Sequence, residues 1–320
     1  MKLSEAINGY KVSKLGDGLS PNTIRGYETH FAQLIEFVGD PNIEEISQDQ
    51  LQRFMIYLRQ DYKPKRLNGD KSPYRSTTIR NAWCAVRSLF GWVHEEFGIE
   101  RSDLVLKMPK VSYPEIRPYT KDEIEQILKF SVYAGEVERD GQRSFRRKNK
   151  SANRNKAIVL LLLDTGVRVS ECASLQVQDV NFQNGEVFVR PVNASSKNKS
   201  RTLRIGAATT KALWRYLAER EEQYPGDALF LSEDNNAITR NGINQLMKRI
   251  GKSAGIKPCY PHRFRHTFAI QFLRNGGDVF SLQHALGHTD WTMTRHYSNL
   301  AESDFANTHR RASPVDNWRL

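Results

Sequence analysis

The chain has 320 residues, of which 39% are hydrophobic, and its mean hydropathy is −0.61. Its longest apolar run, Ala157–Leu163, is far shorter than the ~20 residues that a membrane-spanning helix needs. The N-terminal residues lack the apolar core of a secretory signal. These features argue against a membrane or secreted protein, and the length predicts two domains of about 150 residues each.

The chain is strongly basic, since 48 Lys and Arg against 36 Asp and Glu give a net charge of +12. Residues 1–117 contribute 17 − 15 = +2 and residues 118–320 contribute 31 − 21 = +10. This excess favours nucleic acid as the partner, although a basic enzyme of another kind has the same signature. Residues 139–154 are predicted to form a solvated loop, in which Arg146, Arg147 and Lys148 contact DNA phosphates.

Three cysteines, Cys84, Cys172 and Cys259, lie far apart in the chain and form no CxxC pair. This spacing supports neither a disulfide framework nor a thiolate zinc site. It fits the reducing cytoplasm, where a DNA-binding protein would associate with the nucleoid.

The first hundred residues follow a helical period. Ser20-Pro21 is typical of an N-cap followed by proline at the first helical position, so the first helix is expected to begin at Pro21. Ser47 with Gln50 predicts a capping box for a second helix. A long amphipathic run over Thr77–Phe97 predicts another helix. Residues 1–105 are therefore interpreted as a helical domain and residues 106–117, which lose the period, as a linker.

Residues 118–320 are predicted to form a mostly helical domain with one small antiparallel sheet. Thr120 and Glu123 form a capping box, and Glu186–Arg190 and Arg201–Ile205 are expected to be short strands around a polar hairpin. Helical patterns return at residues 207–223, 240–253, 262–275 and 278–286. The fold class is thus mainly α.

Six of the eight histidines lie within residues 262–309. His262 and His266, and likewise His284 and His288, are spaced i,i+4, a spacing that can hold a metal on a helix face. The first pair encloses two arginines, which repel a cation, and it lacks the glutamate of HExxH. Arginine forks and histidines beside a nucleophile instead suit phosphoryl transfer without a metal.

Four segments, in chain order, resemble the signature boxes of the tyrosine site-specific recombinases, the family of phage integrases and Xer-type resolvases. Residues 165–171 read TGVRVSE and are similar to the box TGxRxSE. Residues 261–266 read PHRFRH and are similar to HxLRH, with Phe264 in place of leucine. Residues 286–288 read LGH, and Tyr297 follows His288 by the nine residues expected of the nucleophile. The resemblance extends to the N-terminal part, which is similar to the family's SAM-like core-binding domain.

This resemblance implies a role for each matching residue. Arg168 and Arg265 would clamp the scissile phosphate, and His262 would act as acid/base and phosphate ligand. His288 would hydrogen-bond the phosphate and help to orient Tyr297. Tyr297 would attack phosphorus and form a 3′-phosphotyrosine.

The resemblance also implies supporting residues around this set. Glu171 and His266 are expected to support the site without touching the phosphate. The lysine that protonates the leaving 5′-hydroxyl is expected at the tip of the polar hairpin, where Lys197 is the first choice and Lys199 the alternative. Lys199 and Arg201 are further expected to contact the DNA backbone.

The implied function is recombination of double-stranded DNA at short inverted-repeat core sites by a homotetramer, with no metal or cofactor. Residues 1–105 would bind core DNA, and residues 118–320 would be the catalytic domain. The expected start of the first helix leaves no room for an arm-binding domain, and the tail around Trp318 would dock on a neighbouring protomer or on its own domain. Integration, excision and dimer resolution stay open, as do a metal-dependent nuclease and a catalytically inactive DNA-binding regulator.

Overall fold

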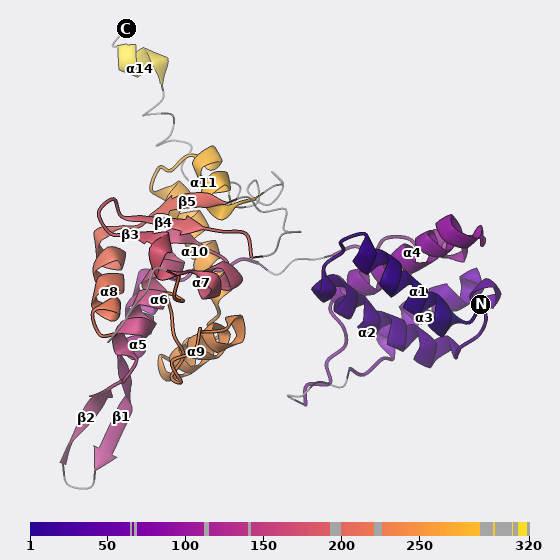
Figure 1. The fold of residues 1–320 in the computed structure, drawn as a ribbon, viewed down its shortest axis with the longest axis horizontal. Helices are drawn as coiled ribbons and strands as arrows, with labels where there is room; N and C mark the ends of the chain where they lie inside the picture. The colour runs from indigo at the N-terminus through magenta and orange to yellow at the C-terminus, as the bar shows by residue number, and fades with distance from the viewer. Residues whose placement is uncertain are drawn as a thin grey trace. The chain divides into compact units, whose positions relative to one another are not determined.

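The computed structural model consists of two compact units, Met1–Glu115 (unit 1) and Ile116–Leu320 (unit 2), and each is described by itself (Figure 1). None of the described helices combines the length and the apolarity that a membrane crossing requires. The residues that the structure describes are 1–64, 66, 69–111, 115–139, 142–192, 200–220, 226–288, 297, 309 and 313–318.

Unit 1 is helical, as its sequence predicts. Ser20 caps its second helix by accepting a hydrogen bond from the backbone N–H of Thr23, and Ser47 and Gln50 form the predicted capping box. The described elements are α1 (Leu3–Gly16), α2 (Pro21–Val38), α3 (Gln48–Gln60) and α4 (Ser76–Phe97), with 3-10 helices at Ile43–Glu45 and Ser102–Val105.

Helix α1 corrects the expectation that the first helix begins at Pro21. Its buried residues Leu3, Ala6, Ile7 and Tyr10 are spaced i, i+3, i+4 and i+7, which is the period of a helix with one apolar face. The signal was therefore present in the sequence. The helix is held by this buried face, because its other positions are mostly polar.

The core of unit 1 is built around aromatic rings. The buried Tyr10 ring meets Phe31 and Trp92 edge-on, with ring centroids 5.6 and 5.9 Å apart. Such edge-to-face pairs add to the free energy gained from burial. Gly9 is required for this packing, because a Cβ there would lie 2.9 Å from the Trp92 ring.

Unit 2 is mainly helical with a small antiparallel sheet of order β3-β4-β5, as predicted. Helix α6 is buried on most sides and packs against α5, α8 and α10, so it forms the centre of the unit. The described elements are α5 (Lys121–Val132), β1 (Tyr133–Arg139), β2 (Gln142–Lys148), α6 (Ala152–Thr165), α7 (Val169–Ser174), a 3-10 helix (Val177–Asp179), β3 (Val180–Asn181), β4 (Glu186–Val189), β5 (Arg201–Arg204), α8 (Ala207–Leu217), α9 (Arg240–Ser253), α10 (Pro261–Arg274), α11 (Val279–Leu286) and α14 (Pro314–Trp318).

Strands β1 and β2 correct the predicted loop at 139–154. They pair antiparallel, and in Figure 1 they extend away from the body of unit 2. Asp140-Gly141, a dipeptide favoured between hairpin strands, was the available signal in the sequence. Arg146, Arg147 and Lys148 lie on β2 rather than in a loop.

The packing of unit 1 predicts the effect of a cavity in α4. Leu89 is fully buried, so Leu89→Ala should lower the free energy of unfolding by about 2–5 kcal/mol. Val12 is 74% exposed, so the matched truncation Val12→Ala should stay within about 0.5 kcal/mol of the parent. Urea unfolding followed by circular dichroism tests both, and equal midpoints for the two variants would contradict the assigned core.

Candidate active site

Separate segments of unit 2 bring Arg168, Arg265, His288 and Tyr297 together. Arg265 lies at the centre and is only 2% exposed. Its guanidinium donates to the carbonyl of Gly166 at 2.8 Å and, through Nη2, to His288 Nε2 at 2.8 Å. One buried side chain thus joins the loop before α7 to the residue that follows α11.

Arg168 precedes α7 and is 30% exposed. Its Nη1 donates to Glu171 Oε1 at 3.2 Å and its Nη2 to the carbonyl of Gly287 at 3.3 Å. Two guanidinium groups therefore meet at one end of α6, with the Arg168 group the more accessible of the two. Planar, permanently charged groups of this kind suit binding of a phosphate.

Two glycines make this close approach of segments possible. Gly166 and Gly287 both have a φ of +61°, in the left-handed region that glycine tolerates best. A Cβ on Gly166 would lie 2.5 Å from the Phe268 ring, and one on Gly287 would lie 2.9 Å from Arg201 Nη1. The glycines of the TGVRVSE and LGH segments are therefore required for steric reasons.

A buried ion pair between Glu171 and Arg201 lies next to the arginine cluster and helps to hold it in place. Glu171 is 2% exposed and accepts from Arg201 Nη1 at 3.0 Å, Arg201 Nη2 at 2.8 Å and the backbone N–H of Arg168 at 2.9 Å. Burial by itself raises the pKa of Glu171, but the hydrogen bonds and charge of Arg201, together with Arg168, outweigh it, so the net pKa is lowered. Glu171 is therefore a carboxylate.

Arg201, which was expected to contact the DNA backbone, is buried within unit 2. It is 4% exposed, and besides Glu171 its Nε donates to the carbonyl of Ala285 at 2.8 Å. These contacts tie β5 to α7 and to the end of α11. The physical reason is the buried Glu171 carboxylate, which needs a cation beside it in a low-dielectric interior.

Helix α10 carries functional candidates on one side. Arg265 points into the cluster. His262 is the exposed residue of the first turn, and its ring packs edge-on against that of His266 at a centroid distance of 4.4 Å. His266 Nδ1 lies 2.7 Å from the hydroxyl oxygen of Tyr297. Tyr297 is 1% exposed, and its ring stacks parallel to that of His288 at a centroid distance of 6.2 Å.

The contact between His266 and Tyr297 was not predicted from the sequence. The sequence suggested that His288 orients the tyrosine, whereas the structure brings His266 into hydrogen-bond contact with it. The available signal was the position of His266 next to Arg265 in the PHRFRH segment. Spacing alone could not tell which histidine would reach a residue 31 positions later.

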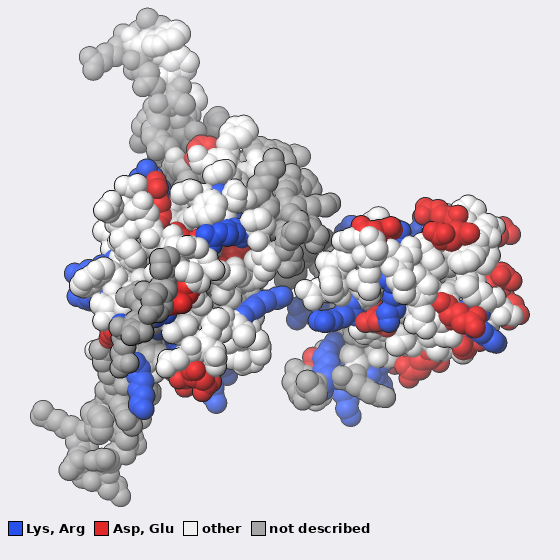
Figure 2. All heavy atoms as spheres, in the orientation of Figure 1, with Lys and Arg blue, Asp and Glu red and all other residues white. Residues whose placement is uncertain are grey.

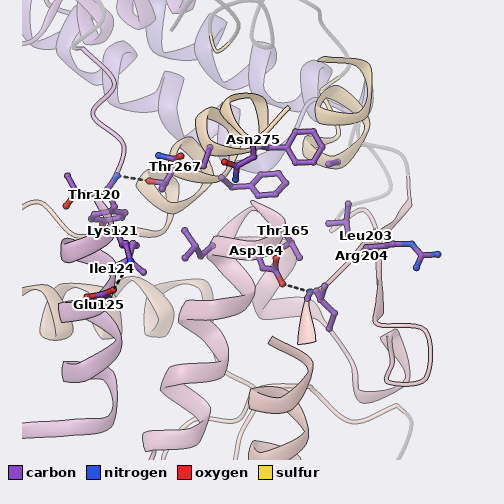
Figure 3. Close-up of a pocket in the computed structure, with 18 residues that line it drawn as sticks. Thr120, Lys121, Ile124, Glu125, Asp164, Thr165, Leu203, Arg204, Thr267 and Asn275 are labelled. Atoms are coloured by element: carbon purple, nitrogen blue, oxygen red, sulfur yellow. Dashed lines mark hydrogen bonds and ion pairs between the residues drawn. The ribbon is translucent and has the colours of Figure 1, made fainter. Parts of the chain in front are cut away.

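The opposite side of α10 is fastened to the start of unit 2. Arg263 donates to the Glu123 carboxylate at 2.9 Å and to the carbonyl of Arg117 at 3.0 Å, and it lies 3.9 Å above the Tyr119 ring. Thr267 Oγ1 accepts from the backbone N–H of Tyr119 at 2.8 Å (Figure 3). These contacts fix α10. They could not be predicted from the sequence, in which Arg263 stands out only as a charge that repels a metal.

The surroundings lower the pKa of two histidines of the site, His288 and His262. Burial, followed by the charges of Arg265 and Arg168, lowers the pKa of His288 to about 4 and also lowers that of His262. Burial raises the pKa of Tyr297, while Arg265 and Arg168 oppose that rise. The arginines therefore favour a negative charge at this position and disfavour a second positive one.

A cavity of about 770 Å³ lies beside the cluster but is distinct from it. Figure 3 shows Thr267 on its wall, and Phe268 and Phe272 of α10 also line it. Asp164 in the same wall accepts from the backbone N–H of Gly206 at 2.7 Å and so helps to hold the start of α8. The arginines and histidines of the cluster are not among the lining residues.

Several predicted residues lie outside this geometry. Lys197 and Lys199 fall outside the described residues. Arg146, Arg147 and Lys148 lie on β2, at the far end of α6 from the arginine cluster.

The buried carboxylate predicts a pH-dependent stability. Because the folded pKa of Glu171 is lowered, its contribution is present above its ordinary pKa of 4.5 and is lost as the pH falls through the folded value. Glu171→Gln should cost about 3–5 kcal/mol at neutral pH, since Arg201 keeps a buried charge without its partner. Urea unfolding at pH 7 and below pH 4.5 should show this difference shrinking in acid. The exposed Glu96→Gln is the matched control, and an equal effect of both variants at pH 7 would contradict the assignment.

Comparison with known proteins gives this geometry a context. Residues 118–304 match the model of the phage integrase family. The chain is 27% identical over 310 residues to the tyrosine recombinase XerD of Listeria monocytogenes serotype 4b (strain F2365), covering 93% of this chain and 94% of that one.

Solved structures of integrases have the same fold. The Tn1549 transposon integrase in complex with circular intermediate DNA matches with a TM-score of 0.72 and 20% identity, covering 97% of this chain and 99% of that one. A lambda integrase dimer bound to a COC′ core site matches with a TM-score of 0.68 and 14% identity, covering 93% and 77%. The chain belongs to the phage integrase family and is an Xer-like tyrosine recombinase, an enzyme that breaks and rejoins DNA.

Proposed function

We propose that this recombinase cuts DNA strands by attack of Tyr297 on the scissile phosphate, which leaves a 3′-phosphotyrosine. The observation that carries the proposal is the buried Tyr297 hydroxyl in one cluster with Arg265, Arg168 and His288. A phenol is a poor nucleophile at neutral pH, since its ordinary pKa is ~10. Adjacent guanidinium groups stabilise the phenolate and the charge that develops on phosphorus.

The remaining roles follow from exposure and charge. Arg168, which is partly exposed, would bind a non-bridging phosphate oxygen together with Arg265, which is held by carbonyls and by His288. His262 on the outer turn of α10 would serve as acid/base and phosphate ligand, and His288 would donate to the phosphate. Glu171 would act indirectly, by holding Arg168 and Arg201.

The leaving 5′-hydroxyl would receive its proton from Lys197, with Lys199 as the alternative. Both belong to the polar segment between β4 and β5, and β5 itself is tied to the site through Arg201 and Glu171. Attack by tyrosine conserves the phosphodiester bond energy in the covalent link. A second DNA hydroxyl can then displace Tyr297 without ATP, metal or cofactor.

Unit 1 would bind the core DNA beside the cleavage site, with residues 1–105 as the binding domain, 106–117 as the linker and 118–320 as the catalytic domain. Residues 1–50 hold 8 Asp and Glu against 4 Lys and Arg, whereas residues 53–87 hold 9 Lys and Arg against 2 Asp and Glu. Figure 2 shows blue groups around the segment that joins α3 to α4. This polarity supports a DNA-facing side formed by the end of α3 and the start of α4.

Assembly and biological role are inferred at a coarser level. A lambda integrase relative is a dimer on its core site. We propose that this chain assembles further, into a homotetramer on two inverted-repeat sites, in the cytoplasm on the nucleoid. Integration, excision and resolution of replicon dimers use the same chemistry, and the DNA flanking the gene would distinguish them.

The role of Tyr297 predicts a selective defect. Tyr297→Phe should bind core DNA as the parent does but form no covalent protein–DNA adduct, because the attacking oxygen is gone. A denaturing gel of labelled nicked DNA after incubation with protein measures the adduct. Tyr133→Phe, at an exposed tyrosine, is the control and should form adduct at the parental level. An adduct retained by Tyr297→Phe would overturn the proposal.

The proposed chemistry also predicts the effect of removing metals. Cleavage and rejoining should proceed at an unchanged rate in excess EDTA, because guanidinium groups supply the charge that a metal would otherwise provide. A single-turnover cleavage assay with and without EDTA is sufficient. A rate that falls with EDTA and returns with Mg²⁺ or Zn²⁺ would instead favour a metal-dependent nuclease.

A further inference from the structure

We propose that His266 is a catalytic residue, the general base that takes the proton of the Tyr297 hydroxyl during cleavage and returns it during rejoining. Its Nδ1 lies 2.7 Å from that oxygen, and among the described residues it is the group that hydrogen-bonds the hydroxyl. The inference rests on the proposed nucleophilic role of Tyr297. It assigns His266 to the reacting atoms rather than to their support.

Burial explains why the tyrosine needs a base within the protein. Tyr297 is 1% exposed, so bulk water has little access to its hydroxyl proton. The proton must pass to a group already in contact, and a general base must lie within about 2.6–3.2 Å of the proton's oxygen. His266 meets this requirement before any DNA is bound.

The position of the His266 ring is fixed. It rises from α10, one residue after the buried Arg265, and the His262 ring packs edge-on against it at 4.4 Å. Arg263 and Thr267 hold the other side of this helix to residues 117–123. With its own proton on Nε2, the ring presents the Nδ1 lone pair to Tyr297.

The other histidines are engaged differently. His288 Nε2 accepts from Arg265 Nη2 at 2.8 Å, and its ring stacks parallel to the Tyr297 ring, so this nitrogen contacts the arginine rather than the Tyr297 hydroxyl. His262 is exposed in the first turn of α10, and under this proposal it binds the phosphate and leaves the proton of Tyr297 to His266. Among the described residues, the rings of His262 and Tyr297 contact His266, and Arg265 precedes it on α10.

The proposed step balances in both directions. During cleavage the Tyr297 oxygen forms a bond to phosphorus, its proton moves to His266 Nδ1, and the bond from phosphorus to the 5′-oxygen breaks. The departing 5′-oxygen takes a proton from the hairpin lysine, here Lys197. During rejoining the 5′-hydroxyl gives its proton back to the lysine as its oxygen bonds to phosphorus, the bond from phosphorus to the Tyr297 oxygen breaks, and His266 returns its proton to the tyrosine. The negative charge that develops on the phosphoryl group in the transition state offsets the positive charge that His266 gains with the proton.

Two substitutions separate proton transfer from hydrogen bonding. His266→Asn places an amide where Nδ1 stands, so it can keep a hydrogen bond to Tyr297 but cannot accept a proton at neutral pH. His266→Gln places its amide further out. A general base contributes about 10²–10⁴-fold, so both variants should form the covalent adduct slower by that factor while binding DNA normally. A parental rate in His266→Asn would overturn the proposal, because hydrogen bonding alone would then be sufficient.

A sulfur-substituted substrate distinguishes the two ends of the reaction. A 5′-bridging phosphorothiolate leaves as a thiolate and needs no proton, so it should restore cleavage by Lys197→Ala, or by Lys199→Ala if that lysine is the acid. It should not restore His266→Asn. Restoration of His266→Asn would move His266 to the leaving-group side and contradict its role as the base.

The pH dependence of single-turnover cleavage gives a third measurement. The parental rate should rise with pH and level off once the base is deprotonated, whereas the rate of His266→Asn should keep rising with hydroxide concentration. Identical profiles for the two proteins would contradict the proposal. Thermal unfolding and DNA affinity show whether each variant is folded, and His94→Asn in unit 1 controls for loss of an exposed imidazole.

Failure of this proposal and failure of the proposed function can be told apart. If Tyr297→Phe still forms an adduct, the nucleophile is wrong, whatever His266 does. If Tyr297→Phe forms no adduct but His266→Asn cleaves at the parental rate, the nucleophile stands and only the base is wrong.

Discussion

The active site depends on the buried carboxylate of Glu171. Three guanidinium groups, those of Arg168, Arg201 and Arg265, gather at one end of α6, where burial makes their mutual repulsion costly. Glu171 offsets part of this charge and binds two of the three directly. Glu171 accepts two hydrogen bonds from Arg201 and two from Arg168, one of them from the Arg168 backbone N–H. The Arg168 side chain is nevertheless 30% exposed, so it is the more accessible partner of this carboxylate.

Helix α10 converts this charge balance into a defined geometry. On one side of the helix, Arg263 and Thr267 bond to the start of unit 2. On the other side, Arg265 and His266 contact the residues of the cluster. Because one side of the helix is anchored, the side chains on its other side have little freedom to move. Proton transfer and phosphate binding both depend on positions held to within about 0.5 Å, and this arrangement supplies that precision.

Helical periods, helix caps and signature boxes could be predicted from the sequence because they depend on residues close together in the chain. Ser20, Ser47 and Thr120 cap helices within three residues of themselves, and their helices lie where predicted. The β1–β2 hairpin was missed because its run of charged residues has the composition of a solvated loop. The burial of Arg201 and the contact between His266 and Tyr297 could not be predicted from the sequence, because each depends on packing between segments that are distant in the chain.

Part of the positive charge of the chain is buried in the structure rather than exposed on its surface. The net excess lies in unit 2, yet Arg201, Arg263 and Arg265 are largely withdrawn from solvent and bonded to carbonyls, carboxylates or histidine. Their charge orders the site rather than attracting DNA from a distance. The same positive field lowers the pKa of His288 and His262 and opposes the rise in the pKa of Tyr297. Under the proposed mechanism, the field that would attract the phosphate also keeps His288 and His262 neutral, and a neutral histidine is able to accept a proton.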